Sequence, residues 1–118
     1  MSAGLNVGVN DMQSEHDLMN DIRHILERLG YIVFRANVGK VRTPDGRWFD
    51  TGLPKGFPDL FACKGGKTYF IEVKVKPNKP TPEQLTFIED IRLKGFTADV
   101  VYSVTEVLRL VDEPQITA

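Results

Sequence analysis

The feature that most constrains this chain is the stretch GFPDLFACKGGKTYFIEVKV at residues 56–75. It predicts two apolar strands joined by a tight turn, because Gly65-Gly66 is a preferred two-residue hairpin loop. Counting outward from that loop in facing pairs places Asp59 opposite Glu72. Facing residues of an antiparallel pair have Cβ atoms roughly 4.5–5.5 Å apart, so like charges placed there repel. The hairpin therefore contains an acid pair that weakens the fold unless something neutralises it.

A lysine lies beside this acid pair. Lys74 is two residues beyond Glu72 and projects from the same face of its strand. Mg²⁺ prefers hard oxygen ligands, and the side chains of Asp59 and Glu72 with the Val73 carbonyl could supply three of them. Lys74 could then hold or deprotonate an attacking water, as hydrolysis of a phosphodiester requires. The alternative is that Lys74 forms an ion pair with one acid, which leaves the second carboxylate uncompensated at close range.

The charge of the chain is unevenly distributed. The net charge is −1, but residues 35–79 contain ten Lys and Arg against four acids, a balance of +6, and the remainder carries −7. A basic field around an acidic pocket suits a polyanion that meets a metal ion. An ordinary solvated surface explains the same numbers, and charge alone does not decide between the two.

The composition predicts one globular domain. The chain has 118 residues, of which 42% are hydrophobic, and its single cysteine excludes an internal disulfide framework. No apolar run has the length of a signal peptide or a membrane span, so we expect a cytoplasmic protein. We predict a flexible leader at 1–13, a domain at 14–111 and a tail at 112–118.

Helix and strand signals alternate along the domain. Ser14, Thr81 and Ser103 are predicted helix caps. The helix after Thr81 has a predicted buried face of Leu85, Phe87, Ile88 and Ile91. Strand patterns cover 31–38 and 97–103, and a small basic hairpin is expected at 40–49. The order predicts an α/β fold, a central mixed sheet flanked by helices.

Three residues outside the hairpin have two interpretations each. Glu15 lies at the start of the first helix, where a carboxylate either favours the helix dipole or belongs to a site. Trp48 could stack on a base or pack beneath the small hairpin, which is the commoner arrangement. Gln84 is at the capping-box position of its helix.

The motifs also resemble a known family. Pro58-Asp59 followed by Glu72-Val73-Lys74, in an α-β-β-β-α-β order, resembles the PD-(D/E)xK nuclease superfamily. The chain is more closely similar to a stand-alone VRR-NUC domain over about Ser14 to Val111. The residues that carry this likeness are Glu15, Arg35, Asn37, Gly56-Phe57-Pro58-Asp59, Ile71-Glu72-Val73-Lys74 and Thr81-Pro82-Glu83-Gln84.

The resemblance implies a restriction-endonuclease-like αβββαβ core and metal-dependent DNA cleavage, with Mg²⁺ as cofactor and Mn²⁺ able to substitute. It implies that Asp59 and Glu72 are metal ligands, that Lys74 is the catalytic lysine and that Glu15 is an outer or second-metal ligand. Gln84 is implied to be a helper that contacts Lys74, water or phosphate. Since we expect one side chain to do only one of these things, the helper role competes with the capping box.

Small relatives resemble Holliday-junction resolvases, which implies a homodimer acting on branched DNA in a bacterial or phage-infected cell, in replication or repair. A catalytically inactive nucleic-acid-binding module and the same chemistry on RNA are the alternatives. The residues expected to contact nucleic acid are Arg35, Asn37, Lys40, Arg42, Arg47, Lys55, Lys76 and Lys79.

Overall fold

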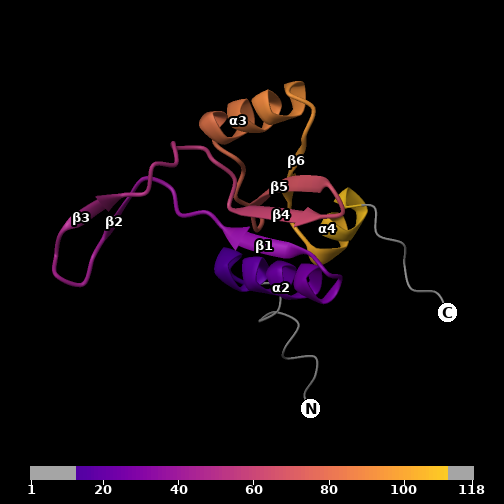
Figure 1. The fold of residues 1–118 in the computed structure, drawn as a ribbon, viewed down its shortest axis with the longest axis horizontal. Coiled ribbons are helices and arrows are strands. Elements are labelled where there is room, and N and C mark those ends of the chain that lie inside the picture. Colours follow the sequence, from indigo (N-terminus) through magenta and orange to yellow (C-terminus); the bar gives the residue numbers. More distant parts are fainter. Residues whose placement is uncertain (1–12, 112–118) are drawn as a thin grey trace, which may run out of the picture.

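The computed structural model describes residues 13–111, and the leader and tail predicted at the two ends lie outside them except for Gln13. Figure 1 shows its helices and strands. They are α2 (Glu15–Arg28), β1 (Ile32–Arg35), β2 (Lys40–Arg42), β3 (Trp48–Asp50), β4 (Leu60–Lys64), β5 (Lys67–Val73), α3 (Pro82–Leu93), β6 (Thr97–Val101) and α4 (Val104–Leu110). Within these residues no helix is both long and apolar enough to cross a membrane.

The central sheet is mixed, as predicted. Its four strands lie in the order β1-β4-β5-β6. The pairs β1–β4 and β4–β5 are antiparallel, whereas β5–β6 is parallel because α3 crosses over between them. β1 and β6 are shorter than the predicted strands.

The register predicted for the glycine hairpin is confirmed. Lys64 pairs with Lys67 across the turn, and the ladder continues to Leu60 opposite Ile71. One further step along the same register places Asp59 opposite Glu72.

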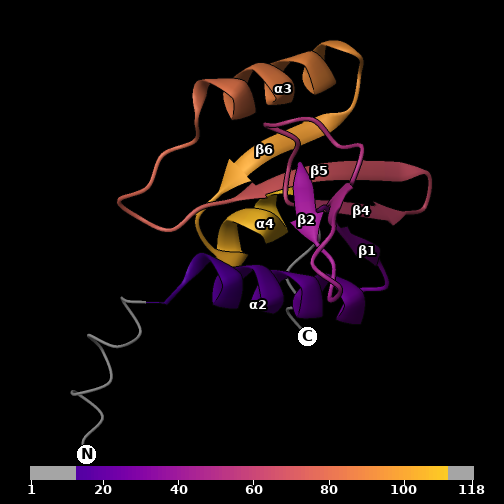
Figure 2. The same ribbon diagram turned by 90° about the vertical axis from the view of Figure 1, so that its left-hand side faces the viewer.

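Helices cover both faces of the sheet (Figures 1 and 2). The larger core lies between the sheet and the helices α2 and α4, where Ile22 and Leu26 pack with Ile71 and Val107. The smaller core lies under α3 and contains Ile88, Ile91 and Ala98, with Phe70 and Phe87 packed against it. Because side chains alternate along a strand, Glu72 and Lys74 share the face of Phe70, on the α3 side.

Local capping chemistry sets where the helices begin. The hydroxyls of Ser14, Thr81 and Ser103 each accept a hydrogen bond from the backbone N–H three residues later, as predicted. The predicted buried face of α3 is wrong at Leu85, which is 51% exposed. The other predicted members of that face are confirmed, because Ile88 and Ile91 are buried and Phe87 packs against them.

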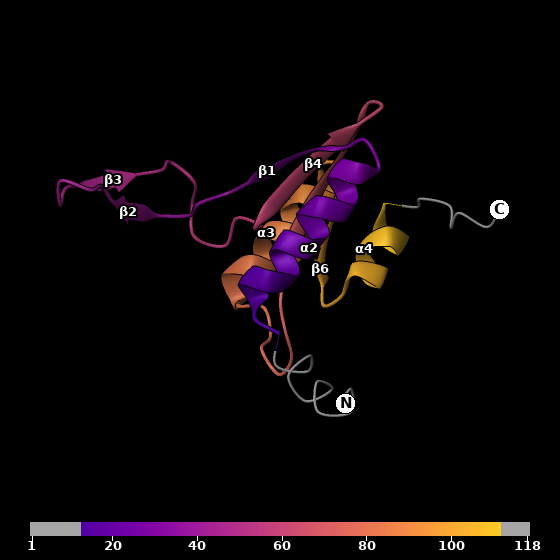
Figure 3. The same ribbon diagram turned by 90° about the horizontal axis from the view of Figure 1, so that it is seen from below.

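The small hairpin predicted at 40–49 forms from β2 and β3, which make a separate two-stranded sheet. It projects from the body of the molecule, as Figures 1 and 3 show. Trp48 on this hairpin is 64% exposed, so the expectation that it packs underneath is wrong. The physical reason is that no other helix or strand of residues 13–111 makes extensive contact with this ribbon.

Candidate active site

The predicted site residues gather at one end of the sheet. Asp59 immediately precedes β4, whereas Glu72 and Val73 are the last residues of β5 and Lys74 follows them. Since β4 and β5 are antiparallel, the start of one strand lies beside the end of the other. The site is therefore built where the ladder between these two strands ends.

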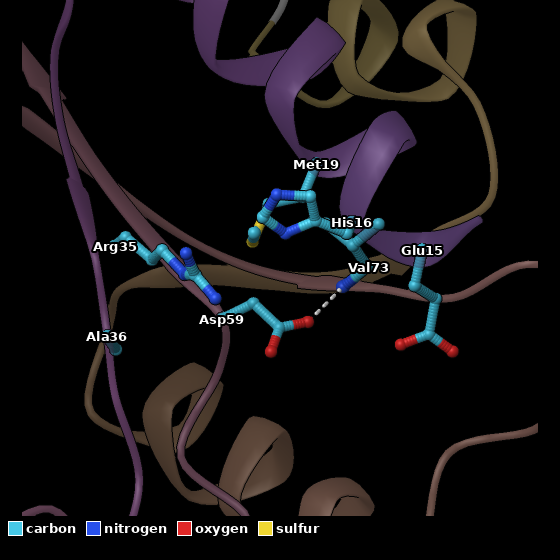
Figure 4. A pocket seen from close by; sticks show the side chains of 7 residues that line it. All are labelled: Glu15, His16, Met19, Arg35, Ala36, Asp59 and Val73. Carbon is cyan, nitrogen blue, oxygen red and sulfur yellow. Dashed lines mark hydrogen bonds between the residues drawn. The ribbon is translucent and has the colours of Figure 1, made fainter. Parts of the chain in front are cut away.

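Backbone hydrogen bonds fix Asp59 in place. Its carbonyl oxygen accepts the Ala36 N–H at 2.8 Å, which ties it to the end of β1. Its side-chain Oδ2 accepts the Val73 N–H at 2.9 Å (Figure 4). One carboxylate oxygen is thus used in positioning, and Figure 4 shows the carboxylate directed into an open pocket.

Proline explains why the ladder opens here. The register places Pro58 opposite Val73, one pair beyond Asp59 and Glu72. Proline has no N–H, so it cannot donate to the Val73 carbonyl as a ladder residue would. The Val73 N–H is already bonded to the Asp59 side chain. The Val73 carbonyl, which was predicted as a third oxygen ligand, therefore lacks its ladder donor.

Glu72 is the most enclosed acid of the site, with a side chain 2% exposed. Its Oε2 accepts a hydrogen bond from Gln84 Nε2 at 3.0 Å and lies 3.7 Å from Lys74 Nζ. Its Oε1 is buried and has no hydrogen-bond partner among the described residues. A buried carboxylate oxygen without a donor is costly, and a bound cation would remove that cost.

The pKa values of the two acids follow from this enclosure. Burial first, and then the nearby Asp59 carboxylate, raise the pKa of Glu72 to about 8, whereas Lys74 opposes the rise. Burial also raises the pKa of Asp59, against the lowering effect of the Val73 N–H. Lys74 does form the ion pair that was considered as the alternative, but that pair leaves the acid pair under-compensated. Without a cation, the site retains a proton near neutral pH.

Gln84 corrects one expectation. Its Oε1 accepts the Thr81 N–H at 2.8 Å and completes the capping box of α3. Its Nε2 meanwhile donates to Glu72. The two ends of one amide therefore perform both tasks that we expected to exclude each other, and the site contact is with Glu72 rather than Lys74.

Glu15 lies at the edge of the same site. With Arg35, Asp59 and Val73 it lines an open pocket of about 260 Å³ (Figure 4). Its Oε2 accepts a hydrogen bond from Asn78 Nδ2 at 3.3 Å, so a loop residue holds it in place. Among residues 13–111, no three His, Cys, Asp or Glu side chains come close enough together to hold a metal ion.

The donor set nevertheless fits one metal. Mg²⁺ is commonly bound through one or two carboxylates and keeps several waters. Asp59 and Glu72 supply two carboxylates, one with an orphaned oxygen, and the Val73 carbonyl lies on the edge that Asp59 occupies. The residues present therefore suit a partly hydrated Mg²⁺ better than a metal held by side chains alone.

Three residues of the site region were missed from the sequence. His16 and Met19 line the pocket from α2, and Asn78 holds Glu15. The place of His16 beside Glu15 in the first helical turn was a usable signal, and Met19 follows one turn later. Asn78 gave none, because it lies in the loop after β5 and its partner is 63 residues away.

The residues expected to bind nucleic acid are divided between two places. Arg35 lines the pocket, and Lys40, Arg42 and Arg47 lie on or beside the projecting hairpin. Lys55 pairs with Glu83 at 3.8 Å. The others, Asn37, Lys76 and Lys79, are exposed in loops at the ends of β1 and β5.

Several solved structures match this chain, and two of them are described as VRR_NUC proteins. One, described as "VRR_NUC domain", is 26% identical, has a TM-score of 0.62 and aligns over 87% of this chain and 100% of its own. The other, described as "VRR_NUC domain protein", is 19% identical, has a TM-score of 0.58 and aligns over 85% of this chain and 86% of its own. No protein-family model matches the sequence. No curated protein matches it either.

Proposed function

We propose that this chain, which has the fold of a VRR-NUC domain and is thereby a nuclease-type domain, is a metal-dependent endonuclease that hydrolyses phosphodiester bonds in DNA. The observation that carries the proposal is the buried Glu72 Oε1, which has no donor among the described residues and belongs to the carboxylate that faces Asp59. Such a pair is destabilising in a purely structural role, whereas a bound cation compensates both carboxylates.

The metal would be held by Asp59, Glu72 and the Val73 carbonyl, with Glu15 as an outer ligand. When bound, Mg²⁺ or Mn²⁺ supplies Lewis-acid polarisation of a phosphoryl oxygen. Gln84 keeps Glu72 oriented through its 3.0 Å hydrogen bond, and the Val73 N–H does the same for Asp59. These bonds fix both carboxylates before any substrate arrives, which is the preorganisation that catalysis requires.

Lys74 is the group proposed to handle the attacking water. Its side chain is 12% exposed and its Nζ lies 3.7 Å from Glu72, so it is held at the site rather than in solvent. An ammonium there can orient a water, and a neutral amine can accept its proton. Arg35 lines the pocket that Asp59 and Val73 also line, and its proposed role is to neutralise the charge of the scissile phosphate.

The proposed substrate is branched DNA, and the proposed active form is a homodimer. One site of this size cuts one strand. A two-fold dimer presents two sites to a four-way junction, which has two-fold symmetry itself. The basic balance of residues 35–79 supports a polyanionic partner, and all of its Lys and Arg except Lys64 and Lys67 lie at this end of the sheet or on the hairpin.

A substrate panel tests the function. Labelled four-way junction, flap and linear duplex DNA, and matched RNA, are incubated with the protein in Mg²⁺, Mn²⁺ or EDTA. We expect metal-dependent nicks in the junction at lower protein concentrations than in the duplex. Salt-sensitive binding without product on any substrate would instead identify an inactive binding module. Cleavage confined to RNA would contradict the proposed substrate.

A further inference from the structure

The projecting hairpin is the part of the fold that the proposed chemistry leaves unused. Among the described elements, its strands β2 and β3 pack mainly against each other. A two-stranded hairpin alone is marginally stable in water. Hydrogen bonds extend the pairing beyond the strands, because the Thr51 N–H donates to the Gly39 carbonyl at 2.8 Å and the Gly39 N–H to Leu53 at 3.2 Å. The ribbon is thus paired along its whole length, with no supporting layer from the part of the chain that the structure describes.

Its turn is also tied together internally. The Thr43 N–H donates to the Arg47 carbonyl at 2.8 Å, and the Gly46 N–H donates to the Thr43 carbonyl at 2.9 Å. The Asp45 carboxylate accepts from the Thr43 hydroxyl and the Arg47 N–H. A ribbon that maintains its shape in solvent is suited to presenting side chains to a partner.

The two faces of this ribbon differ in chemistry. Trp48 pairs with Arg42, and Lys40 pairs with Asp50, so these four side chains share one face. The Asp50 carboxylate is engaged by the Gly52 N–H at 2.9 Å. The other face carries Val41 and Phe49, with Phe49 57% exposed.

On the first face an aromatic ring and a cation form a stacked pair. The Arg42 guanidinium carbon lies 5.4 Å from the centre of the Trp48 ring, in cation–π geometry. With the ring 64% exposed, aromatic surface remains open to a ligand. An exposed aromatic surface beside a cation is the arrangement on which nucleobases stack while phosphates are neutralised.

The position of the hairpin connects it to the proposed active site. It joins the end of β1 to the start of β4, and Figure 1 shows it leaving the sheet at that end. Arg35 and Asp59, which flank this insertion in the sequence, both line the pocket. A nucleic acid bound at the pocket can therefore continue along the ribbon.

We propose that the Trp48 face of the β2–β3 hairpin is a stacking platform for an unpaired nucleobase of the DNA substrate, on the arm that leaves the sheet at the same end as the proposed active site. The inference rests on the proposed nuclease function and adds a feature that the substrate must have. Bases in a fully paired duplex are already stacked, whereas a branch point or bubble offers unstacked ones. The platform thereby favours DNA with unpaired bases over continuous duplex.

The sole tryptophan of the chain makes the test specific. Its fluorescence is followed in EDTA, where no cleavage occurs, during titration with a blunt duplex and with the same duplex carrying an unpaired thymidine bubble. We expect quenching by the bubble at concentrations at which the duplex leaves the emission unchanged. Equal quenching by both, or none by either, overturns the proposal.

Variants separate stacking from folding of the ribbon. Binding of the Trp48 variants is measured by the anisotropy of a fluorophore on the bubble DNA, since they lack tryptophan. Trp48→Ala should weaken this binding by roughly 5- to 150-fold, and Trp48→Phe should restore most of it. Phe49→Ala is the matched control on the opposite face and should bind as the wild type does. An equal loss in Phe49→Ala contradicts the proposal. A tryptophan emission of the DNA-free protein that shifts to the red when dilution separates the protomers also contradicts it, because a second copy would then cover the Trp48 face.

The two proposals fail in different ways. Cleavage in Mg²⁺ without quenching in EDTA overturns the stacking platform and leaves the nuclease intact. Quenching by the bubble without cleavage of any substrate overturns the nuclease and supports the platform.

Discussion

Burial beside Asp59 raises the pKa of Glu72 from an ordinary value of 4.5 to about 8 in the metal-free protein. Between these two values the native state holds a proton that the unfolded chain has lost. Native stability therefore falls as the pH rises through this range, because the unfolded state binds fewer protons there. Asp59 shifts in the same direction.

The fall of native stability with rising pH gives a prediction for the metal-free protein. The melting temperature in EDTA should fall between about pH 5 and pH 8, measured by scanning fluorimetry in buffers of equal ionic strength. Glu72→Gln is the control, because glutamine has nearly the shape of glutamate but does not titrate. Its melting temperature should therefore depend less on pH. Added Mg²⁺ should raise the melting temperature of the wild type most at the upper end of this pH range. A wild-type curve as flat as that of Glu72→Gln would contradict the pKa argument.

Gln84 tests how capping and active-site positioning share one side chain. Gln84→Ala removes the bonds to both Thr81 and Glu72. We expect a loss of about 0.5–2 kcal/mol in unfolding free energy, as for other caps, together with a fall in the cleavage rate.

Thr81→Ala is the matched variant for this prediction. It removes the hydroxyl that accepts the Gln84 N–H but leaves the contact between Gln84 and Glu72. A similar loss of stability with wild-type cleavage is expected. If both variants cleave alike, Gln84 acts on the helix alone.

At the scale of elements, the first turn of α3 and the loop before β4 meet closely at Gly56. Gly56 is buried with φ +95°, and a Cβ there would lie 2.7 Å from the Glu83 carbonyl oxygen. The loop that delivers Asp59 thus packs on the helix that delivers Gln84. Glycine is required at this contact by both conformation and space.

Substituting this glycine should therefore disturb two parts of the site together. Gly56→Ala is expected to reduce unfolding free energy by about 1–3 kcal/mol beyond the loss in Gly52→Ala. Gly52 is the control because its φ is +84° but nothing lies within 4 Å of its Cβ position. Urea unfolding of the two variants gives the comparison, and equal losses would show that the close contact tolerates a methyl group.

The elements that sequence reasoning predicted correctly are those fixed by local chemistry. The Gly65-Gly66 loop sets the register that brings Asp59 to Glu72, and side-chain hydroxyls set the helix starts. What it missed depends on how distant elements approach. The second bond of Gln84, the exposure of Leu85 and the contact of Asn78 with Glu15 all depend on the packing of α2, α3 and the loop after β5, which no local pattern specifies.

Across the whole molecule, the proposed centre takes one part from each layer. Glu15 comes from α2 on one face of the sheet, Asp59 and Glu72 from its strands, and Gln84 from α3 on the other face. The hairpin leaves the sheet at the same end (Figure 1). The fold thereby brings the acid pair, Lys74 and the basic β2–β3 hairpin to one end of the sheet, which is where we propose that DNA is cut.

The central claim is that Asp59, Glu72 and Lys74 form the hydrolytic centre, and single-turnover cleavage of the four-way junction in Mg²⁺ tests it most directly. The wild type is compared with Asp59→Asn, Lys74→Ala and Lys67→Ala, each checked for folding. Lys67, an exposed lysine at the opposite end of β5, is the matched control. We predict rates at least about 10²-fold lower for Asp59→Asn and Lys74→Ala and a wild-type rate for Lys67→Ala. Wild-type cleavage by folded Asp59→Asn or Lys74→Ala would contradict the account.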